Sequence, residues 1–326
     1  MRLLEQDLIN PSLVTVQSCI LISQYLGGEG NVKAKHIYVG VAMLHSQVIR
    51  LSQTIEVINQ SDIVTREVRR RTWLSVVIAD RWSSADMSTL SKTSGESNPA
   101  YLVADEKEFM ALNHTTGQSY AAPLGSSENG LWAQMAKTIE TFRHISETIH
   151  ALGSGQSSIS SQQDNIVHLT IKLDEWEQGL PTGLSFTTEN LEYFHSFGFG
   201  KTFLAMHIGF HHFRQLLYFP FLDSRRTSVA NPQLRYIELC KMNAMQVSHI
   251  ASISRRTGGC DLLYYIIGHI LVVSSSVHLH TLLFSDLEEA DLARGHLVSN
   301  FETLMELKTY WPVIDSMVSF TPHQRY

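Results

Sequence analysis

Helical periodicity of apolar residues runs through almost the whole sequence, and it is the feature that most constrains the fold. Alternating strand-like runs bounded by turn residues are scarce. The pattern therefore predicts an all-α chain, an irregular multi-helix domain of about nine to ten helices. The expected helices span approximately residues 13–26, 32–53, 62–84, 106–112, 128–152, 164–177, 189–222, 232–256, 261–285 and 287–310.

The first helix has recognisable end signals. Asn10 is a good N-cap residue and Pro11 suits the first helical position, so we expect the helix to begin there. Its apolar run ends at Gly27 and Gly28, which indicate a turn into the next helix.

Two segments rich in small polar residues interrupt the helices. Residues 84–128 contain Ser, Thr, Gly and Asn with Pro99 and Pro123, and residues 153–163 read GSGQSSISSQQ. Both are predicted to be loop or linker insertions, the first with one short helix near residues 106–112. We interpret residues 1–326 as one helical domain that carries these insertions.

Composition and charge exclude several classes of protein. Hydrophobic residues make up 44% of the 326 residues and charged residues 17%, which is enough apolar surface for a core and too little charge for a disordered chain. The formal net charge of −6 provides no excess cations for a run of phosphates, so direct nucleic-acid binding is not expected.

The chain is expected to reside in a reducing compartment, nuclear or cytoplasmic. Cys19, Cys240 and Cys260 form no CxxC pair, and the N-terminal residues do not resemble a secretory signal. The apolar run 262–284 is long enough to span a membrane, but three histidines and three consecutive serines interrupt it. A buried core helix is therefore favoured over membrane insertion.

No cofactor motif is convincing. The segment GFGKT at residues 198–202 ends like a phosphate-binding loop, but it lacks the first glycine and the preceding strand that such a loop needs. No GxSxG or HExxH motif occurs. We therefore expect no cofactor.

The 16 histidines are the main candidates for chemistry. His207 and His211 lie four residues apart on one predicted helix face beside His212, and a third ligand could come from His278 or His280. No acidic residue completes that helix turn, so no metal site is predicted. Two readings stay open: a polar seam in which histidines bond to backbone or serines, or a pocket in which these histidines, with Tyr264 and Tyr265, orient a ligand or move a proton.

The stretch VRRRTWLSVVIADRWSSADMS, residues 68–88, contains an arginine run, an aromatic-apolar helix and a closing Asp-Arg. It resembles the signature of the fungal-specific transcription factor domain, the middle homology region of zinc-cluster regulators. The matching residues are Arg69, Arg70, Arg71, Trp73, Asp80, Arg81 and Ser84. The family's following Gly-Arg-Pro is replaced here by residues 87–90. A structural role for the arginines, as partners of helix C-termini or acidic residues, is favoured over phosphate contact.

Further similarities keep the family's order along nearly the whole chain. They are SLVTVQSCILISQYLGGEGN, YVGVAMLHSQVIRL, LDEWEQGLP and LLYFPFL. The resemblance implies an all-helical regulatory domain that normally follows a cysteine-rich zinc-cluster head, and this sequence shows no such head.

The sequence supports two functional hypotheses. The first is the regulatory domain of a fungal transcription factor, whose partner is a small-molecule effector or a regulatory protein. The alternative is the same scaffold used as a small-molecule-binding protein or as a cofactor-independent acid/base enzyme acting on an apolar molecule, with His207, His211 and His212 as its catalytic groups. A homodimer is left open, and neither membrane nor nucleic acid is expected as a partner.

Overall fold

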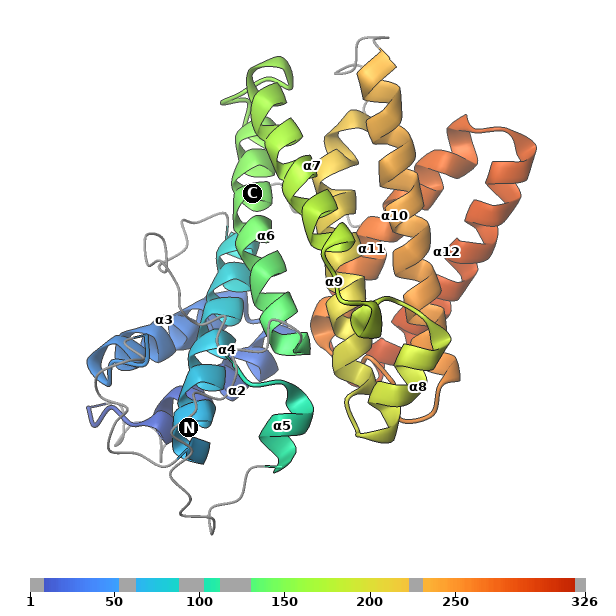
Figure 1. The fold of residues 1–326 in the computed structure, drawn as a ribbon. Coiled ribbons are helices and arrows are strands. Elements are labelled where there is room, and N and C mark those ends of the chain that lie inside the picture. The colour runs from blue at the N-terminus through green and yellow to red at the C-terminus, as the bar shows by residue number, and fades with distance from the viewer. Residues whose placement is uncertain (1–8, 53–62, 88–102, 112–129, 223–230, 320–326) are drawn as a thin grey trace. The chain divides into compact units, whose positions relative to one another are not determined.

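The computed structural model describes residues 9–52, 63–87, 103–111, 130–222 and 231–319 (Figure 1). Helix accounts for 82% of these described residues, and no strand occurs among them. The all-α prediction is confirmed. Twelve α-helices are present in the described ranges, ten of them with seven or more residues.

By its internal contacts the chain divides into two compact units, residues 1–143 and 144–326, and each is described here by itself. The boundary falls inside one helix, α6 (Leu131–Gly153). The prediction that residues 1–326 act as one domain is not tested by this division and stays a prediction.

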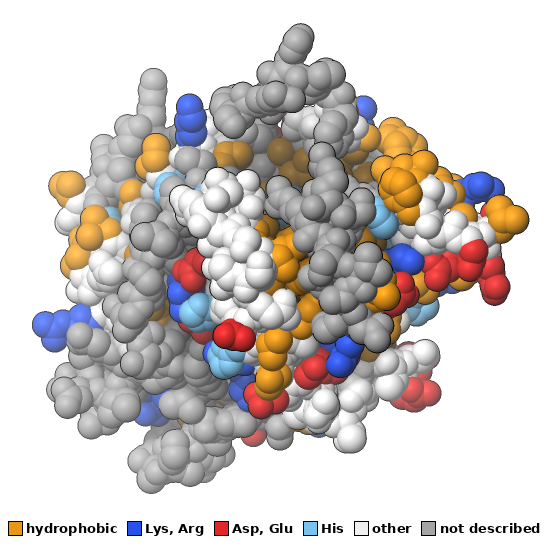
Figure 2. Space-filling view, turned by 90° about the horizontal axis from the view of Figure 1, so that it is seen from above, with side chains coloured by type: hydrophobic (Ala, Val, Ile, Leu, Met, Phe, Trp, Pro, Cys, Tyr) orange, Lys and Arg blue, Asp and Glu red, His pale blue; other side chains and the backbone are white. Residues whose placement is uncertain are grey.

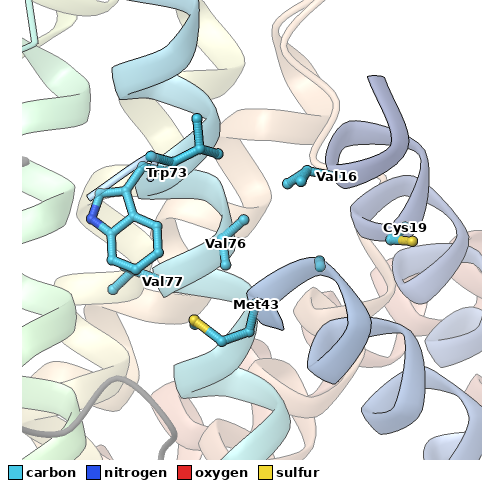
Figure 3. Packing of buried hydrophobic residues seen from close by; sticks show 8 residues of the cluster. Val16, Cys19, Met43, Trp73, Val76 and Val77 are labelled. Atoms are coloured by element: carbon cyan, nitrogen blue, oxygen red, sulfur yellow. The ribbon is translucent and has the colours of Figure 1, made fainter. Parts of the chain in front are cut away.

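The first unit is organised around a helical hairpin and the long helix packed against it. The hairpin consists of α2 (Leu13–Gly28) and α3 (Val32–Val48), and the long helix is α4 (Ile63–Met87). The unit also contains the short α5 (Glu106–Ala111) and the first part of α6. Both α2 and α3 pack against α4. Their shared core includes Val16 and Cys19 of α2, Met43 of α3 and Trp73 of α4 (Figure 3).

The second unit is also built of α-helices. These are α7 (Gln163–Gln178), α8 (Thr188–Ser196), α9 (Gly200–Tyr218), α10 (Asn231–Arg256), α11 (Tyr265–Phe284), α12 (Leu287–Lys308) and α13 (Val313–Val318), with 3₁₀ turns at Ser160–Gln162, Thr182–Leu184 and Phe219–Leu222. Figure 1 shows α10, α11 and α12 side by side, and these three helices pack against one another.

Several predicted helix boundaries were wrong. The first helix is capped by Ser12, whose hydroxyl oxygen accepts from the Thr15 amide at 3.1 Å, and not by Asn10. A serine at N-cap lets Pro11 stay outside the helix. The predicted helix 189–222 is two helices, because Gly198 adopts a φ of 81°, which a continuous α-helix cannot contain.

The loop insertions predicted at residues 84–128 and 153–163 are not tested as insertions and stay predictions. Within 84–128, α4 continues to Met87 and the short helix α5 is present as expected, while residues 88–102 and 112–129 lie outside the described residues. Residues 154–159 lie between α6 and a 3₁₀ turn.

Helix α11 is the one helix in the described ranges that is long and apolar enough to cross a membrane by length and composition, and 44% of its most apolar window is buried in the structure. Its buried residues include the polar Ser274 and His278, and the helix packs against α10, α12 and α13. These contacts agree with the core helix that the sequence favoured.

Candidate functional site

A buried polar network lies where α10, α11 and α12 meet. The Nε2 atom of His278 on α11 lies 2.9 Å from the Ser248 hydroxyl of α10 and 3.3 Å from the Ser274 hydroxyl. The Ser274 hydroxyl donates to the Ala244 carbonyl at 2.9 Å, and the Asn300 amide of α12 donates to Ser275 at 3.1 Å. Hydrogen bonds between side chains therefore join these three helices in an otherwise apolar interior.

Beside this network is a pocket of about 240 Å³ between the same three helices. His278 and His296 line this pocket, and Met242 and Met245 add flexible apolar side chains to the lining. The remaining lining residues are Glu238, Lys241, Thr281, Glu289, Leu292 and Ala293. A hollow that combines apolar surface with a few polar groups is the usual form of a small-molecule site.

The two histidines of the pocket are held neutral. The imidazoles of His278 and His296 stack with ring centroids 5.0 Å apart. Burial, with a smaller contribution from His296, lowers the pKa of His278 to about 4. Burial and the nearby His249 also lower the pKa of His296. At neutral pH these rings offer hydrogen bonds to a ligand and no positive charge.

The charged rim of the pocket is already paired. The Lys241 ammonium lies 2.9 Å from Glu289 and 3.4 Å from Glu238, and it donates to the Ser285 hydroxyl at 3.0 Å. Its three donors therefore have protein acceptors, and two carboxylates face one ammonium. The rim is not arranged to attract an anion.

The three neighbouring histidines that the sequence singled out do not face one cavity. His207 donates from Nε2 to the Leu184 carbonyl at 2.9 Å, and burial lowers its pKa to about 4. His211 donates from Nδ1 to the Asn243 amide oxygen at 2.9 Å. His212 is completely buried and its ring lies edge-on to His269 at 5.5 Å. Burial lowers the pKa of His211 and of His212 as well.

The other candidates are spread over α11. His278 lines the pocket, whereas His280 packs its ring on Phe284 at 4.9 Å and is absent from the lining. Tyr264 is 48% exposed at the start of α11, and Tyr265 contacts the Trp311 ring at 6.2 Å. Of the seven site candidates in this unit, His278 alone lines one of the two pockets described here.

These contacts favour the interpretation that most of the histidines form a polar seam bonded to backbone or serines. His207 bonds to backbone and His278 to serines, as that reading expects. A catalytic role for His207, His211 and His212 is not tested and stays a prediction. Within the described residues, no cluster of three or more His, Cys, Asp or Glu could hold a metal ion.

The sequence analysis missed His296, Lys241 and the two methionines of the pocket. His296 stands alone in its sequence neighbourhood, so local spacing gave it no weight. A helical pairing of α11 with α12 would have brought it opposite His278, but that pairing cannot be read from either helix by itself.

A second pocket, of about 490 Å³ and more open to solvent, lies between α8 and α10. It is lined by Phe186, Thr187, Thr188, Leu191, Gln246, His249, Ile253, Arg256 and Thr257. The ring of Phe186, which lines this pocket, lies 5.1 Å from the ring of His207, which does not.

The arginine run of α4 has structural partners in the first unit. Arg69 donates to the Ile49 carbonyl at 2.7 Å, at the C-terminus of α3. Arg71 lies 2.9 Å from the buried Glu67 and donates to the Ala104 carbonyl at 2.7 Å. Arg70 lies 3.7 Å from Glu67. These contacts are those expected of arginines that stabilise helix ends and acidic groups.

The other signature residues of α4, Trp73, Asp80 and Arg81, are also buried. Trp73 is 2% exposed within the core shared with α2 and α3. Arg81 is buried and donates to Glu140 of α6 at 3.0 Å, and Asp80 is fully buried. The sequence pattern from Arg69 to Arg81 is thus explained by packing within this unit.

Together the fold and these contacts define an all-helical domain built around an arginine-rich signature helix. The chain belongs to the family of the fungal specific transcription factor domain, whose model matches residues 3–178, just over half of the 326 residues. No curated protein and no solved structure matches the chain.

The matched segment ends inside the LDEWEQGLP motif and does not reach LLYFPFL, so the match is shorter than the resemblance suggested. It contains α2 to α7 and stops before α10. The pocket between α10, α11 and α12 therefore has no counterpart in the family match, and its role must be argued from its own residues. The absence of a zinc-cluster head stays a prediction.

Proposed function

We propose that this chain is a transcription-regulatory domain, acting in the nucleus, that binds a small-molecule effector in the pocket between α10, α11 and α12. One observation carries the proposal: the apolar pocket opens onto a neutral His278 that belongs to a hydrogen-bonded network shared by three helices. A ligand there would touch all three helices at once.

The chemistry of the pocket selects the ligand. Met242, Met245 and Leu292 offer apolar contact, and the two neutral imidazoles offer hydrogen bonds. The paired rim of Lys241, Glu238 and Glu289 leaves no surplus positive charge. The preferred effector is therefore an uncharged, mostly apolar molecule with one polar group at the histidine end.

The effector would act by favouring one arrangement of the three helices. A ligand shifts a conformational equilibrium only as far as its affinity differs between the two states. His278 contacts Ser248 and Ser274 and also lines the pocket, so a ligand that hydrogen-bonds the ring would stabilise this arrangement of α10 and α11.

The enzyme alternative is less well supported by the contacts. Acid/base catalysis needs its groups within reach of one substrate atom. His207, His211 and His212 have three different neighbours, namely the Leu184 carbonyl, the Asn243 amide and the His269 ring. An effector site at His278 needs no such convergence.

The test uses the full chain and a fluorescent probe of suitable size. We would titrate 2-naphthol, a neutral bicyclic molecule with one hydroxyl, and in parallel 2-naphthoate, its anionic counterpart. Binding of the neutral probe at least tenfold tighter than the anion is expected from the paired rim, since tenfold corresponds to about 1.4 kcal/mol.

A matched pair of variants locates the site. Met242→Trp fills the pocket from its wall, and Leu234→Trp adds the same bulk to an exposed position of α10 outside it. Binding should be lost in Met242→Trp and retained in Leu234→Trp. Equal binding by both variants, or preference for the anion, would contradict the proposal.

A further inference from the structure

Helix α2 is apolar on two opposite faces. Its 16 residues include no charged side chain. One face is buried: Leu26 is 7% exposed, and Val16 and Cys19 belong to the core shared with α3 and α4 (Figure 3). On the opposite face Val14, Leu21 and Tyr25 are 69%, 71% and 54% exposed.

Helix α3 repeats this arrangement. Val39, Ala42 and Met43 are buried on the face toward the core. On the other face Ile37, Leu44 and Val48 are 64%, 58% and 59% exposed. The exposed apolar residues thus have the same spacing on both helices, at i, i+7 and i+11.

When one half-buried residue between the first two exposed residues of each helix is included, successive positions on the outer face lie four, three and four residues apart. This spacing defines a helix-bundle seam. The seam of α2 is Val14, Ser18, Leu21 and Tyr25, and the seam of α3 is Ile37, Val41, Leu44 and Val48. Ser18 and Val41 are half-buried at the edge of the outer face, and Val41 also packs against the core. Three residues, 29–31, join the helices, which makes them an antiparallel hairpin. The hairpin therefore presents two neighbouring seams, half of a four-helix bundle.

The exposed area suits a second copy of the same hairpin. At about 100 Å² for each of these six side chains, the outer face presents roughly 600 Å², at the upper end of what monomers leave exposed. Two such faces would remove about 1,200 Å² from water, which reaches the range of specific stable interfaces.

Charge also suits a symmetric pair. No seam position is charged, and the charged residues of the described hairpin are Glu29 at the turn and Lys33 and Lys35, of which Lys35 is buried. A two-fold interface places equivalent surfaces opposite each other, so a face without like charges is well adapted to it. We propose that two copies of this chain pair through the outer faces of α2 and α3 to form a four-helix bundle.

The experiment measures the mass of the full chain in solution. Sedimentation velocity from about 1 to 50 µM should give twice the 36.8 kDa of one chain. The variant Leu21→Glu/Leu44→Glu places a charge in each seam and should be a folded monomer. The control Gln24→Glu/Gln47→Glu adds the same charges to the same helices at exposed positions outside the seams and should stay dimeric.

Circular dichroism of each variant reports whether the helices are kept. Should the charged variant fail to fold, Leu21→Gln/Leu44→Gln gives the same test with less disruption and should weaken the dimer at least tenfold. A wild-type chain that is monomeric over this range overturns the proposal, whether the face is covered by another protein or by other residues of the chain. A dimer that both seam variants leave intact overturns it as well.

Discussion

The imidazole rings of His278 and His296 lie stacked, 5.0 Å apart with an interplanar angle of 17°. They come from α11 and α12, and both line the pocket. Two rings this close cannot both carry a proton without strong repulsion, and burial opposes protonation of each. Both imidazoles are therefore uncharged at neutral pH. Protonating them in acid should weaken the pocket and lower the stability of the fold.

This neutrality predicts a pH dependence of stability. The pKa of His278 and that of His207 are each lowered to about 4, whereas histidine in an unfolded chain titrates near 6.5. Between these values the unfolded chain takes up protons that the folded chain does not, so the free energy of unfolding falls as the pH falls through this window. Each site contributes up to about 3 kcal/mol of this loss at the acid end.

Urea unfolding at pH 7.5, 6.5 and 5.5 measures the slope above the range where most carboxylates titrate. His278→Gln and His207→Gln should each be less stable than the wild type at pH 7.5 and show a shallower dependence on pH. A slope that is unchanged in both variants would show that these two rings are not the groups responsible.

Arg69 should contribute to the stability of the first unit through the end of α3. Its guanidinium donates to the Ile49 carbonyl at 2.7 Å, and a cation at a helix C-terminus is favourable. Arg69→Met keeps the aliphatic stem and should lower the free energy of unfolding by about 1–2 kcal/mol. Arg66→Met is the matched control, because Arg66 is a half-buried arginine on the same helix, three residues before Arg69. Equal losses in the two variants would contradict this role.

Glu67 and Arg71 should show strong energetic coupling. Burial raises the pKa of the Glu67 carboxyl, although the Arg71 guanidinium and the Ala104 amide oppose that rise. Arg71→Met leaves a buried carboxylate without its main partner and should cost about 3 kcal/mol. Glu67→Gln removes the charge, so the double variant should lose less than the sum of the single variants by about 1–2 kcal/mol. Additive losses in this double-mutant cycle would mean that the pair is not coupled.

Local sequence signals were sufficient for the helices and for the signature arginines. Apolar periodicity located most helices to within a few residues, and the short helix at residues 106–111 was expected in an otherwise polar stretch. The arginine run was expected to serve helix ends and acidic groups, and Arg69 and Arg71 do so. These properties depend on neighbours along the chain or on one adjacent helix.

The pocket could not be predicted in the same way. It exists because Lys241, His278 and His296, on three different helices, meet at one place, and single-helix patterns do not give the rotation of one helix against another. The break between α8 and α9 was missed for a related reason. Gly198 is flanked by apolar residues that continue the helical pattern, and its left-handed φ is a property of the folded backbone.

The exposed apolar surface at the C-terminal end of α11 and the start of α12 could not be predicted from the sequence either. Figure 2 shows apolar side chains beside acidic ones at the right-hand edge, where these two helices lie. At the end of α11 and the start of α12, Leu283, Phe284 and Leu287 are 70%, 74% and 87% exposed. In the sequence they continue the run of a core helix, and exposure follows from where the neighbouring helices end.

Two glycines of α9 should respond in opposite ways to alanine. A Cβ on Gly200 would lie 2.5 Å from the Cys260 sulfur and 3.3 Å from the backbone of His195, whereas a Cβ on Gly209 meets nothing within 4 Å. Gly200→Ala should therefore lower the free energy of unfolding by about 2 kcal/mol through overpacking. Gly209→Ala should raise it by about 0.5–1 kcal/mol, because alanine loses less backbone entropy in a helix interior.

Urea unfolding of both variants measures the difference, and the Cys260→Ala/Gly200→Ala double variant should recover part of the loss by removing the sulfur. A Gly200→Ala protein as stable as Gly209→Ala would mean that α9 and the segment around Cys260 are not packed as closely as the structure places them.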